Sequence, residues 1–284
     1  MTETKPTLAW LGTGLMGRSM AERLLAQGYS LWVWNRTRAK AQALAAHGAK
    51  VAATPAEAVA NSQLVFTMLA DFAATAAVLQ EIDLSGKTLV QMATIAPDQS
   101  QELANRVERA GGAYLEAPVL GSTPEARAGA LIVMVGGQED RFLKLYPILA
   151  NLGPKPRRIG EVGKASALKL ALNQLIATLT AAFAISLAFV QEHQVEVEVF
   201  MEILRQSALY APTFDKKLGR MRAHDYQNPN FPIEHLIKDI HLFRQATETL
   251  DVSLIEAVQN LYARASAGHR REDYSCVFEA VEKR

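Results

Sequence analysis

The chain has 284 residues, of which 49% are hydrophobic and 21% charged, and its formal net charge is +1. This composition is typical of a globular protein and excludes a disordered chain, and the length allows one large or two moderate domains. A nearly neutral chain has no bulk attraction for nucleic acid or anionic membranes. The single cysteine, Cys276, cannot pair within the chain, so the fold does not depend on an oxidising compartment.

The N-terminus and one apolar stretch bear on cellular location. Residues 1–6 lack a basic segment followed by an apolar one, so we expect no signal peptide and interpret the protein as cytoplasmic. Residues 170–191 carry no charge and are about long enough to cross a bilayer. Because polar side chains such as Asn173 and Thr180, together with six alanines, dilute this stretch, we expect a buried central helix rather than a membrane span.

Strand and helix patterns alternate over the first half of the chain. Short apolar runs predict strands at 8–11, 30–34, 50–52, 64–69, 88–92, 113–116 and 131–135. Helices are expected at 16–27 and 38–47, each ended by a glycine, and two more are expected to begin near Thr54 and Phe72. Strands that alternate with helices of this length imply a parallel sheet covered on both faces.

The pattern changes after about residue 160, beyond a turn-forming Gly-Pro-Lys-Pro cluster at 153–156. The remainder predicts long helices, first the uncharged segment and then 197–206, 233–250, 254–267 and 276–282. We therefore predict an α/β domain of the nucleotide-binding type at 1–162, followed by an all-helical domain at 163–284.

A glycine-rich turn follows the first predicted strand and opens a helix. Residues 12–17 read Gly-Thr-Gly-Leu-Met-Gly, which matches G-x-G-x-x-G. Gly12 permits the tight turn, Gly14 lets the backbone approach a pyrophosphate, and Gly17 lets helix and strand pack closely. A turn without a ligand is the alternative, but this context favours a dinucleotide site that also includes Thr13, Leu15 and Met16.

The end of the second strand indicates which dinucleotide binds. An NAD site would place an acidic residue there, to accept hydrogen bonds from the ribose hydroxyls. This chain has Asn35-Arg36-Thr37-Arg38 instead. Arginine and threonine side chains bind the extra phosphate of NADP, which a carboxylate would repel, so these residues favour NADPH/NADP as the cofactor. The alternative is that the arginines have no ligand and belong to a solvated helix N-terminus.

These motifs, with others further along the chain, resemble the β-hydroxyacid dehydrogenases over essentially the whole length. The resemblance includes Lys169 with Asn173 and Lys238 with Asp239, and it also includes the segments Glu-Ala-Pro-Val at 116–119, Gly-Ala-Leu at 129–131 and Gly-Gly at 136–137. Within that family, Phe231-Pro-Ile and the Asn-Arg-Thr triplet look closest to the NADPH-dependent glyoxylate/succinic semialdehyde reductases, a group that also resembles 3-hydroxyisobutyrate dehydrogenase.

The resemblance implies a Rossmann-like dinucleotide-binding domain, a long interdomain helix and an all-α domain, assembled as a homodimer or homotetramer. It implies that the cofactor contacts the glycine turn, Thr94 and Lys238. It also implies that Lys169 is the catalytic residue, with Asn173 beside it. Met68 and Leu69, at the end of a predicted strand, are further cofactor-binding candidates.

The chemistry of Lys169 and Asn173 fits carbonyl reduction. Because the two residues are four apart on one predicted helix, their side chains share a face. Hydride addition to a carbonyl carbon creates negative charge on the oxygen, which an ammonium stabilises and then protonates. The alternative for Lys169 is a solvated lysine at a helix start. No metal-ligand spacing joins the histidines, so no metal is expected.

Two departures from the family pattern affect the expected site. Leu120 stands where the family usually has a serine that helps to hold the substrate carboxylate. Gly121 and Ser122 are retained, and their backbone N–H groups would still form an anion-binding concavity. The second departure is Gln-Met-Ala-Thr at 91–94, where Asp-Met-Ser-Thr is common; Thr94 is kept.

The remaining candidates each have a structural alternative. Asp239 is expected to face the site, with Lys238 toward the cofactor, although the two residues also read as a solvated pair. Phe231 is expected either to close the site as an apolar wall or to be part of the core. Glu116 is expected either to flank the substrate-binding segment or to be an ordinary carboxylate at a strand end.

The sequence therefore predicts an NADPH-dependent reductase of a small aldehyde or keto acid such as glyoxylate or succinic semialdehyde. A dehydrogenase of 3-hydroxyisobutyrate or a related 3-hydroxy acid is the alternative enzyme. A non-catalytic nucleotide-binding module is the alternative from another class, and retention of Lys169 argues against it.

Overall fold

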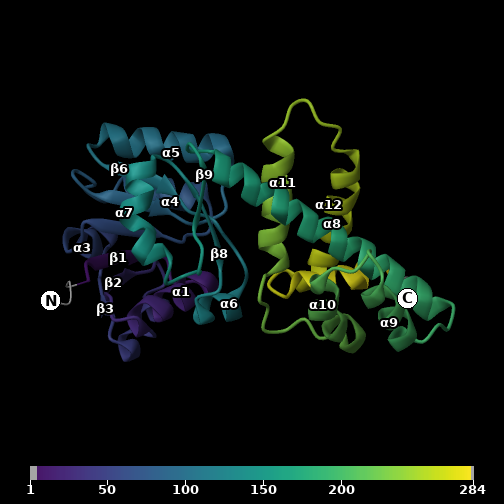
Figure 1. Ribbon diagram of the computed structural model, residues 1–284. Coiled ribbons are helices and arrows are strands. Elements are labelled where there is room, and N and C mark those ends of the chain that lie inside the picture. The colour runs from purple at the N-terminus through teal and green to yellow at the C-terminus, as the bar shows by residue number, and fades with distance from the viewer. Residues whose placement is uncertain (1–4, 283–284) are drawn as a thin grey trace. The chain divides into compact units, whose positions relative to one another are not determined.

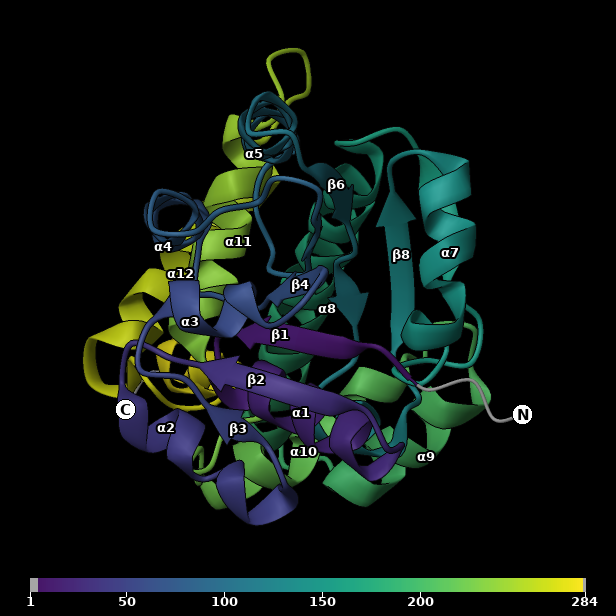
Figure 2. The same ribbon diagram turned by 90° about the vertical axis from the view of Figure 1, so that its left-hand side faces the viewer.

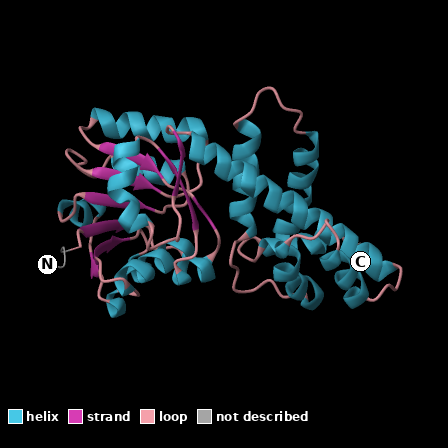
Figure 3. Cartoon of the chain, viewed as in Figure 1, coloured by secondary structure: helices cyan, strands magenta, loops and turns pink. Residues whose placement is uncertain are grey.

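The structure is a computed structural model that describes residues 5–282. Its contacts divide the chain into two compact units, Met1–Lys169 and Leu170–Arg284. Strands form the core of the first unit, whereas the second is built from helices (Figure 3). The first unit thus ends within the second turn of the long helix α8 (Lys164–Glu192), while the sequence placed the boundary just before that helix.

The first unit is built on one mostly parallel sheet. Its strands are β1 (Thr7–Leu11), β2 (Ser30–Trp34), β3 (Lys50–Val51), β4 (Leu64–Thr67), β5 (Thr88–Gln91), β6 (Ala113–Glu116), β7 (Val119–Leu120), β8 (Ile132–Gly136) and β9 (Arg157–Gly160). Their order is β3-β2-β1-β4-β5-β6-β8-β7, with β9 beside β8. Figure 2 shows β1 and β2 side by side.

The order of the first six strands confirms the Rossmann-like prediction. All pairs among β1 to β6 are parallel, and the direction of winding reverses between β1 and β4. In such sheets a ligand binds at the carboxyl ends of the strands at this reversal. The sheet is mostly parallel, as predicted, and departs from the prediction at one side, where β8 runs antiparallel to both β6 and β7. The short β7–β8 connection through 121–131 permits that reversal.

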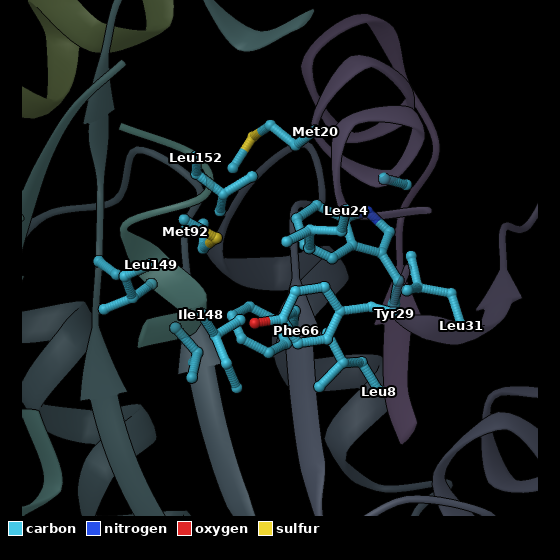
Figure 4. Close-up of a cluster of buried hydrophobic side chains, with 14 of the residues drawn as sticks. Leu8, Met20, Leu24, Tyr29, Leu31, Phe66, Met92, Ile148, Leu149 and Leu152 are labelled. Carbon is cyan, nitrogen blue, oxygen red and sulfur yellow. The ribbon is translucent and has the colours of Figure 1, made fainter. Parts of the chain in front are cut away.

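Helices cover both faces of this sheet, as predicted (Figure 1). They are α1 (Leu15–Ala26), α2 (Arg38–Gln42), α3 (Pro55–Ala60), α4 (Phe72–Leu79), α5 (Pro97–Arg109), α6 (Thr123–Ala128) and α7 (Glu139–Leu149). Alternate residues of β1 point to opposite faces. Leu8 and Trp10 join a core with α1 and α7 that also includes Phe66 and Leu24 (Figure 4), while Ala9 belongs to a second core with α3, α4 and α5.

The helix expected at 38–47 is divided in two. Helix α2 ends at Gln42, and a 3-10 turn η1 (Ala45–His47) follows. Gly48 ends the segment with a φ of +88°, as its position after the helical pattern predicted. The early part of this segment remains helical, so Arg38 begins a helix and Thr37 occupies its N-cap.

The second unit consists of the rest of α8 with α9 (Val197–Gln206), α10 (Pro212–Ala223), α11 (Ile233–Gln245), α12 (Ser253–His269) and the 3-10 segment η2 (Tyr274–Ala280). Helix α11 ends five residues earlier than the sequence suggested. Thr247, Thr249 and Asp251 follow it, and these residue types favour turns over helix interiors. The unit's core includes Phe183, Met201, Phe214, Tyr262 and Phe278.

Helix α8 is long and apolar enough to cross a membrane by length and composition. One stripe along it is buried, and this stripe carries Ala177, Ala181, Ala184 and Leu187 into the core of the second unit. A buried stripe at helical spacing is typical of the core helix of a folded protein. The sequence-based expectation of a central buried helix agrees with this burial.

Candidate active site

The three glycines of the turn after β1 serve different purposes. Gly12 has a φ of +102°, and a Cβ there would lie 2.3 Å from the carbonyl oxygen of Met68. A Cβ on Gly17 would lie 2.1 Å from the carbonyl oxygen of Gly12. The fold therefore needs both residues to be glycine. A Cβ on Gly14, by contrast, would meet no atom within 4 Å, so the fold itself leaves that position open.

Gly14 is the N-cap of α1, and helix geometry leaves the first-turn N–H groups of Leu15, Met16 and Gly17 without partners inside the helix. These groups and the positive end of the helix dipole favour an anion. The open space at Gly14 and the free donors beside it fit a pyrophosphate. The residues present therefore suit the phosphates of a dinucleotide.

The neighbouring strand ends contribute the other predicted contacts. Met68 and Leu69 follow β4, and both are half-buried. Thr94 follows β5 and is also half-buried. Gln91 braces the loop before Thr94, because its amide nitrogen donates to the carbonyl of Ala93 at 3.0 Å and its amide oxygen accepts from the Ala93 N–H. This brace gives a structural reason for Gln91, a departure from the family pattern.

Asn35 holds the end of β2 against the glycine turn. Its side-chain oxygen accepts from the N–H of Thr13 at 3.0 Å, and its side-chain nitrogen donates to the carbonyl of Thr37 at 3.0 Å. Asn35 is therefore an internal support of the turn, a role that its sequence position does not reveal. Arg36, Thr37 and Arg38 are exposed beside it, and neither arginine forms an ion pair with a described residue.

Lys169 and Asn173 lie on the buried stripe of α8. Lys169 is only 8% exposed and Asn173 only 1%. Successive positions of this stripe, Ser166, Lys169 and Asn173, are three and four residues apart, so their side chains leave the same side of the helix. A lysine with so little contact with solvent is unusual. The interpretation of Lys169 as a solvated helix-start residue is therefore wrong.

Asp239 fixes the orientation of Asn173. The side-chain nitrogen of Asn173 donates to Asp239 Oδ2 at 2.6 Å, and Asp239 is 3% exposed. Because a carboxylate only accepts, the amide oxygen of Asn173 points elsewhere, and no described residue donates to it. Lys238 Nζ lies 3.1 Å from Asp239 Oδ1, so the two neighbouring residues form an ion pair.

In the segment after β7, one of the two N–H groups expected to bind an anion already has a partner. Leu120 pairs with Ile132 at the end of β7 and is half-buried. Gly121 has a φ of +129°. The N–H and the hydroxyl of Ser122 both donate to Glu125 Oε2, at 2.8 and 2.6 Å. The Ser122 N–H thus already has a carboxylate partner within the protein, Glu125, to which the sequence-based prediction assigned no role.

Two further candidates have structural partners. The ring of Phe231 packs edge-on against Tyr274 with centroids 5.7 Å apart, at the margin of the helical core. Glu116 is fully buried at the end of β6 and accepts hydrogen bonds from the start of α8. Glu116 is thus neither an ordinary solvated carboxylate nor one available to bracket a substrate.

Known proteins are similar to this chain over nearly its whole length. Residues 7–163 match the model of the NAD binding domain of 6-phosphogluconate dehydrogenase, and residues 163–281 match a model described as "NAD-binding of NADP-dependent 3-hydroxyisobutyrate dehydrogenase". Glyoxylate/succinic semialdehyde reductase 2, chloroplastic, of Arabidopsis thaliana is 33% identical over 97% of this chain and 79% of its own length. The chain belongs to the β-hydroxyacid dehydrogenase family. It is a NAD(P)-dependent oxidoreductase of the hydroxy acid dehydrogenase type.

This β-hydroxyacid dehydrogenase has relatives of more than one kind. Glyoxylate/succinic semialdehyde reductase 1 of A. thaliana is 30% identical over 97% of this chain and 98% of its own length. Cytokine-like nuclear factor N-PAC of Drosophila melanogaster is 28% identical over 97% of this chain and 47% of its own length. A solved structure, 3-hydroxyisobutyrate dehydrogenase of Mycobacterium tuberculosis with L-serine, superimposes with a TM-score of 0.89 at 23% identity, covering 98% of this chain and 100% of that one.

Proposed function

We propose that this protein is an NADPH-dependent reductase of a small aldehyde or keto acid, such as glyoxylate or succinic semialdehyde. The observation that carries this proposal is the buried polar stretch of α8, where Lys169 and Asn173 share one face. An ammonium and an amide are uncommon at buried positions of a core helix. A charge-stabilising and proton-donating role gives both residues a purpose.

When bound, the reduced nicotinamide supplies the hydride that forms the new C–H bond. Lys169 stabilises the oxygen that becomes negative, and then gives it the proton that completes the alcohol. Asn173, held by Asp239, offers its amide oxygen as an acceptor, which suits the Lys169 ammonium or a substrate hydroxyl. Asp239 is therefore proposed to contribute to the site by holding the Asn173 amide in place, and Lys238 is proposed to contact the cofactor.

The preference for NADPH over NADH rests on the end of β2. Arg36, Thr37 and Arg38 are exposed there, and no acidic residue occupies 35–38. A guanidinium binds a phosphate through paired charge-assisted hydrogen bonds. Since Asn35 is already engaged with the glycine turn, the arginines and Thr37 are the groups left to contact a 2′-phosphate.

Substrate choice is proposed to follow from the segment 120–122. With Leu120 in place of a hydroxyl and the Ser122 N–H donated to Glu125, this segment offers a substrate carboxylate weaker anchoring than the usual serine would. We infer that less polar carbonyl compounds are accepted beside the short acids. Restoring serine at 120 should shift the ranking of substrates toward acids, and an unchanged ranking would contradict this inference.

The alternative enzyme is a dehydrogenase of 3-hydroxyisobutyrate or a related 3-hydroxy acid. Specificity constants separate the two functions when glyoxylate, succinic semialdehyde and 3-hydroxyisobutyrate are each tested with both cofactors. The proposal predicts the highest kcat/KM for an aldehyde acid with NADPH. A clear preference for 3-hydroxyisobutyrate with NAD would overturn it, and binding of NADPH without turnover of any of these compounds would favour a non-catalytic module.

We further propose that the protein is cytoplasmic and works as a homodimer or homotetramer. Large apolar side chains are exposed on the helical unit: Phe189 on α8 is 60% exposed and Ile203 on α9 is 65% exposed. Exposed apolar side chains gathered on neighbouring helices mark surfaces that bind other chains.

A further inference from the structure

The N-terminus of α8 is held by a buried carboxylate. Glu116 Oε1 accepts from the N–H groups of Gly163 at 2.9 Å, Ala165 at 2.8 Å and Ser166 at 3.2 Å. Glu116 Oε2 accepts from the hydroxyls of Ser166 at 2.6 Å and Ser100 at 2.5 Å. One side chain at the end of β6 thus accepts five hydrogen bonds, three of them from the first turn of α8 and one from Gly163, the residue just before that helix.

This carboxylate has 0% exposure, and within the described residues no lysine, arginine or histidine forms an ion pair with it. A buried charge without a counter-ion is costly unless hydrogen bonds and dipoles stabilise it. Here the amides and the positive end of a 29-residue helix do so. Gly136 makes room for it, because a Cβ there would lie 2.2 Å from Glu116 Oε1.

The same contacts determine where Lys169 lies. Ser166, which donates to Glu116 through both its N–H and its hydroxyl, precedes Lys169 by three residues on the buried stripe. A helix advances about 1.5 Å and turns about 100° per residue, so a slip of one position at its start would carry Lys169 off that face. Holding Ser166 therefore fixes both the height and the direction of Lys169.

Glu116 also connects this helix to the cofactor side of the sheet. It ends β6 and pairs in register with Gln91 of β5, the residue that braces the loop before Thr94. Glu116, Gln91, the glycine turn and Lys169 all belong to the first unit. A short path of hydrogen bonds and one strand pair thus joins the dinucleotide-binding edge to the start of α8.

We propose that Glu116 is a positioning residue for the reaction, whose buried carboxylate sets the register of α8 and thereby the place of the Lys169 ammonium relative to the cofactor-binding edge. This inference rests on the proposed role of Lys169 as proton donor. Glu116 itself touches no reacting atom and acts only through the helix.

Two substitutions separate position from charge. Glu116→Gln keeps the length of the side chain and an oxygen that accepts from the α8 amides, and the two serine hydroxyls are able to rotate and accept from its nitrogen. Its kcat for glyoxylate with NADPH should stay within about threefold of the wild type. Glu116→Asp keeps the charge but is shorter by one methylene, so kcat should fall about 10- to 100-fold while the Kd of NADPH is unchanged.

A double-mutant cycle tests whether Glu116 acts through Lys169. In a Lys169→Ala background, Glu116→Asp should cause almost no further loss of kcat, because the group that it positions is gone. If the two losses multiply fully, or if Glu116→Asp alone leaves kcat unchanged, the positioning role is refuted. If Lys169→Ala alone leaves kcat unchanged, the proposed function fails first, so the two failures are distinguishable.

A matched control distinguishes positioning from general helix capping. Glu57 accepts from the N–H of Ala53 at the start of α3, a helix in the same unit that carries no site residue. Glu57→Asp should lower stability slightly and leave kcat unchanged. If Glu116→Asp does not fold, Ser166→Ala takes its place, because it removes one hydrogen bond to Glu116. Ser166→Ala should lower kcat about threefold or more, and it should cause almost no further loss in the Lys169→Ala background. An unchanged kcat in Ser166→Ala would then overturn the proposal.

Discussion

At the scale of single residues, Gly14 is a position where the fold would accept a side chain but the expected dinucleotide would not. Its φ of −68° suits any residue, and a Cβ there would meet no atom. Gly14→Ala should therefore fold with a free energy of unfolding within about 1 kcal/mol of the wild type. Because the new methyl group would enter the space expected for the pyrophosphate, the Kd of NADPH should rise about 10- to 100-fold, which fluorescence titration measures.

Two other glycines act as controls for that substitution. Gly219→Ala lies in α10 with open space around it and should leave NADPH binding unchanged. Gly17→Ala should destabilise the protein strongly, since its Cβ would overlap the carbonyl oxygen of Gly12. NADPH binding by Gly14→Ala at the wild-type Kd would show that the dinucleotide does not approach this turn.

The exposed arginines at the start of α2 support a second prediction at this scale. Arg36 and Arg38 form no ion pair with a described residue, so their removal should not disturb the fold. The double substitution to alanine should lower kcat/KM with NADPH about 10- to 1,000-fold and leave kcat/KM with NADH nearly unchanged, because only NADPH carries the 2′-phosphate. Equal loss with both cofactors would contradict a phosphate-binding role.

Some of these residue roles were predictable from the sequence and others were not. The G-x-G-x-x-G spacing and its place after a strand predicted the turn, because that chemistry is local. The role of Asn35 depends on a contact with Thr13, twenty-two residues away, that no motif encodes. The pairing of Ser122 with Glu125 was readable as the S-x-x-E pattern of a capping box, which the sequence-based prediction overlooked. Glu116 shows the limit of local motifs most clearly, since its partners at the start of α8 lie about fifty residues further along the chain.

At the scale of elements, α10 and the 3-10 segment η2 are joined by a buried ion pair. Lys217 Nζ lies 2.8 Å from Asp273 Oδ1, and Asp273 is fully buried. Burial alone would raise the pKa of Asp273, but the charge of Lys217 and the hydrogen bonds from Lys217 and Ser275 outweigh it and hold that pKa below the usual value. Burial lowers the pKa of Lys217, and this effect exceeds the opposing effect of the Asp273 charge, so the pKa of Lys217 lies below its usual value.

This pair predicts a defined response to acid. Because the pKa of Asp273 is lower in the folded protein, its contribution to stability is complete above the unfolded pKa of about 3.9 and is lost as the pH falls through the folded pKa. Asp273→Asn should cost about 3–5 kcal/mol at neutral pH, since it leaves Lys217 buried without a carboxylate. Urea unfolding should show the difference between wild type and variant shrinking as the pH falls below about 3.9. A difference that does not depend on pH would contradict the pair's role.

The elements themselves were mostly predictable, since periodic apolar residues indicate helices and strands directly. Helix α9 has the predicted bounds and α12 nearly so. The antiparallel direction of β8 could not be derived, because strand direction depends on pairing partners rather than on local pattern. Helix α7 contains Pro147 in its last turn, which weakens the helical signal there.

At the scale of the whole molecule, the exposed apolar side chains of the helical unit predict self-association. Phe189 and Ile203 belong to this set, which also includes Leu175, Ile185 and Val199. Light scattering after size exclusion should give the mass of a dimer or tetramer. Phe189→Asp with Ile203→Asp should shift the mass toward the monomer without unfolding the chain. A wild-type monomer at all concentrations would contradict the proposed assembly.

The central claim is that Lys169 donates the proton in an NADPH-dependent reduction, and the kinetics of Lys169→Ala test it most directly. The Kd of NADPH should remain near the wild-type value, because the proposed phosphate contacts lie at the glycine turn and the end of β2, away from Lys169 in the sequence. The kcat of Lys169→Ala for glyoxylate or succinic semialdehyde should fall about 100- to 10,000-fold, because the proton donor is gone. A variant that binds NADPH and reduces these substrates at the wild-type rate would contradict the claim.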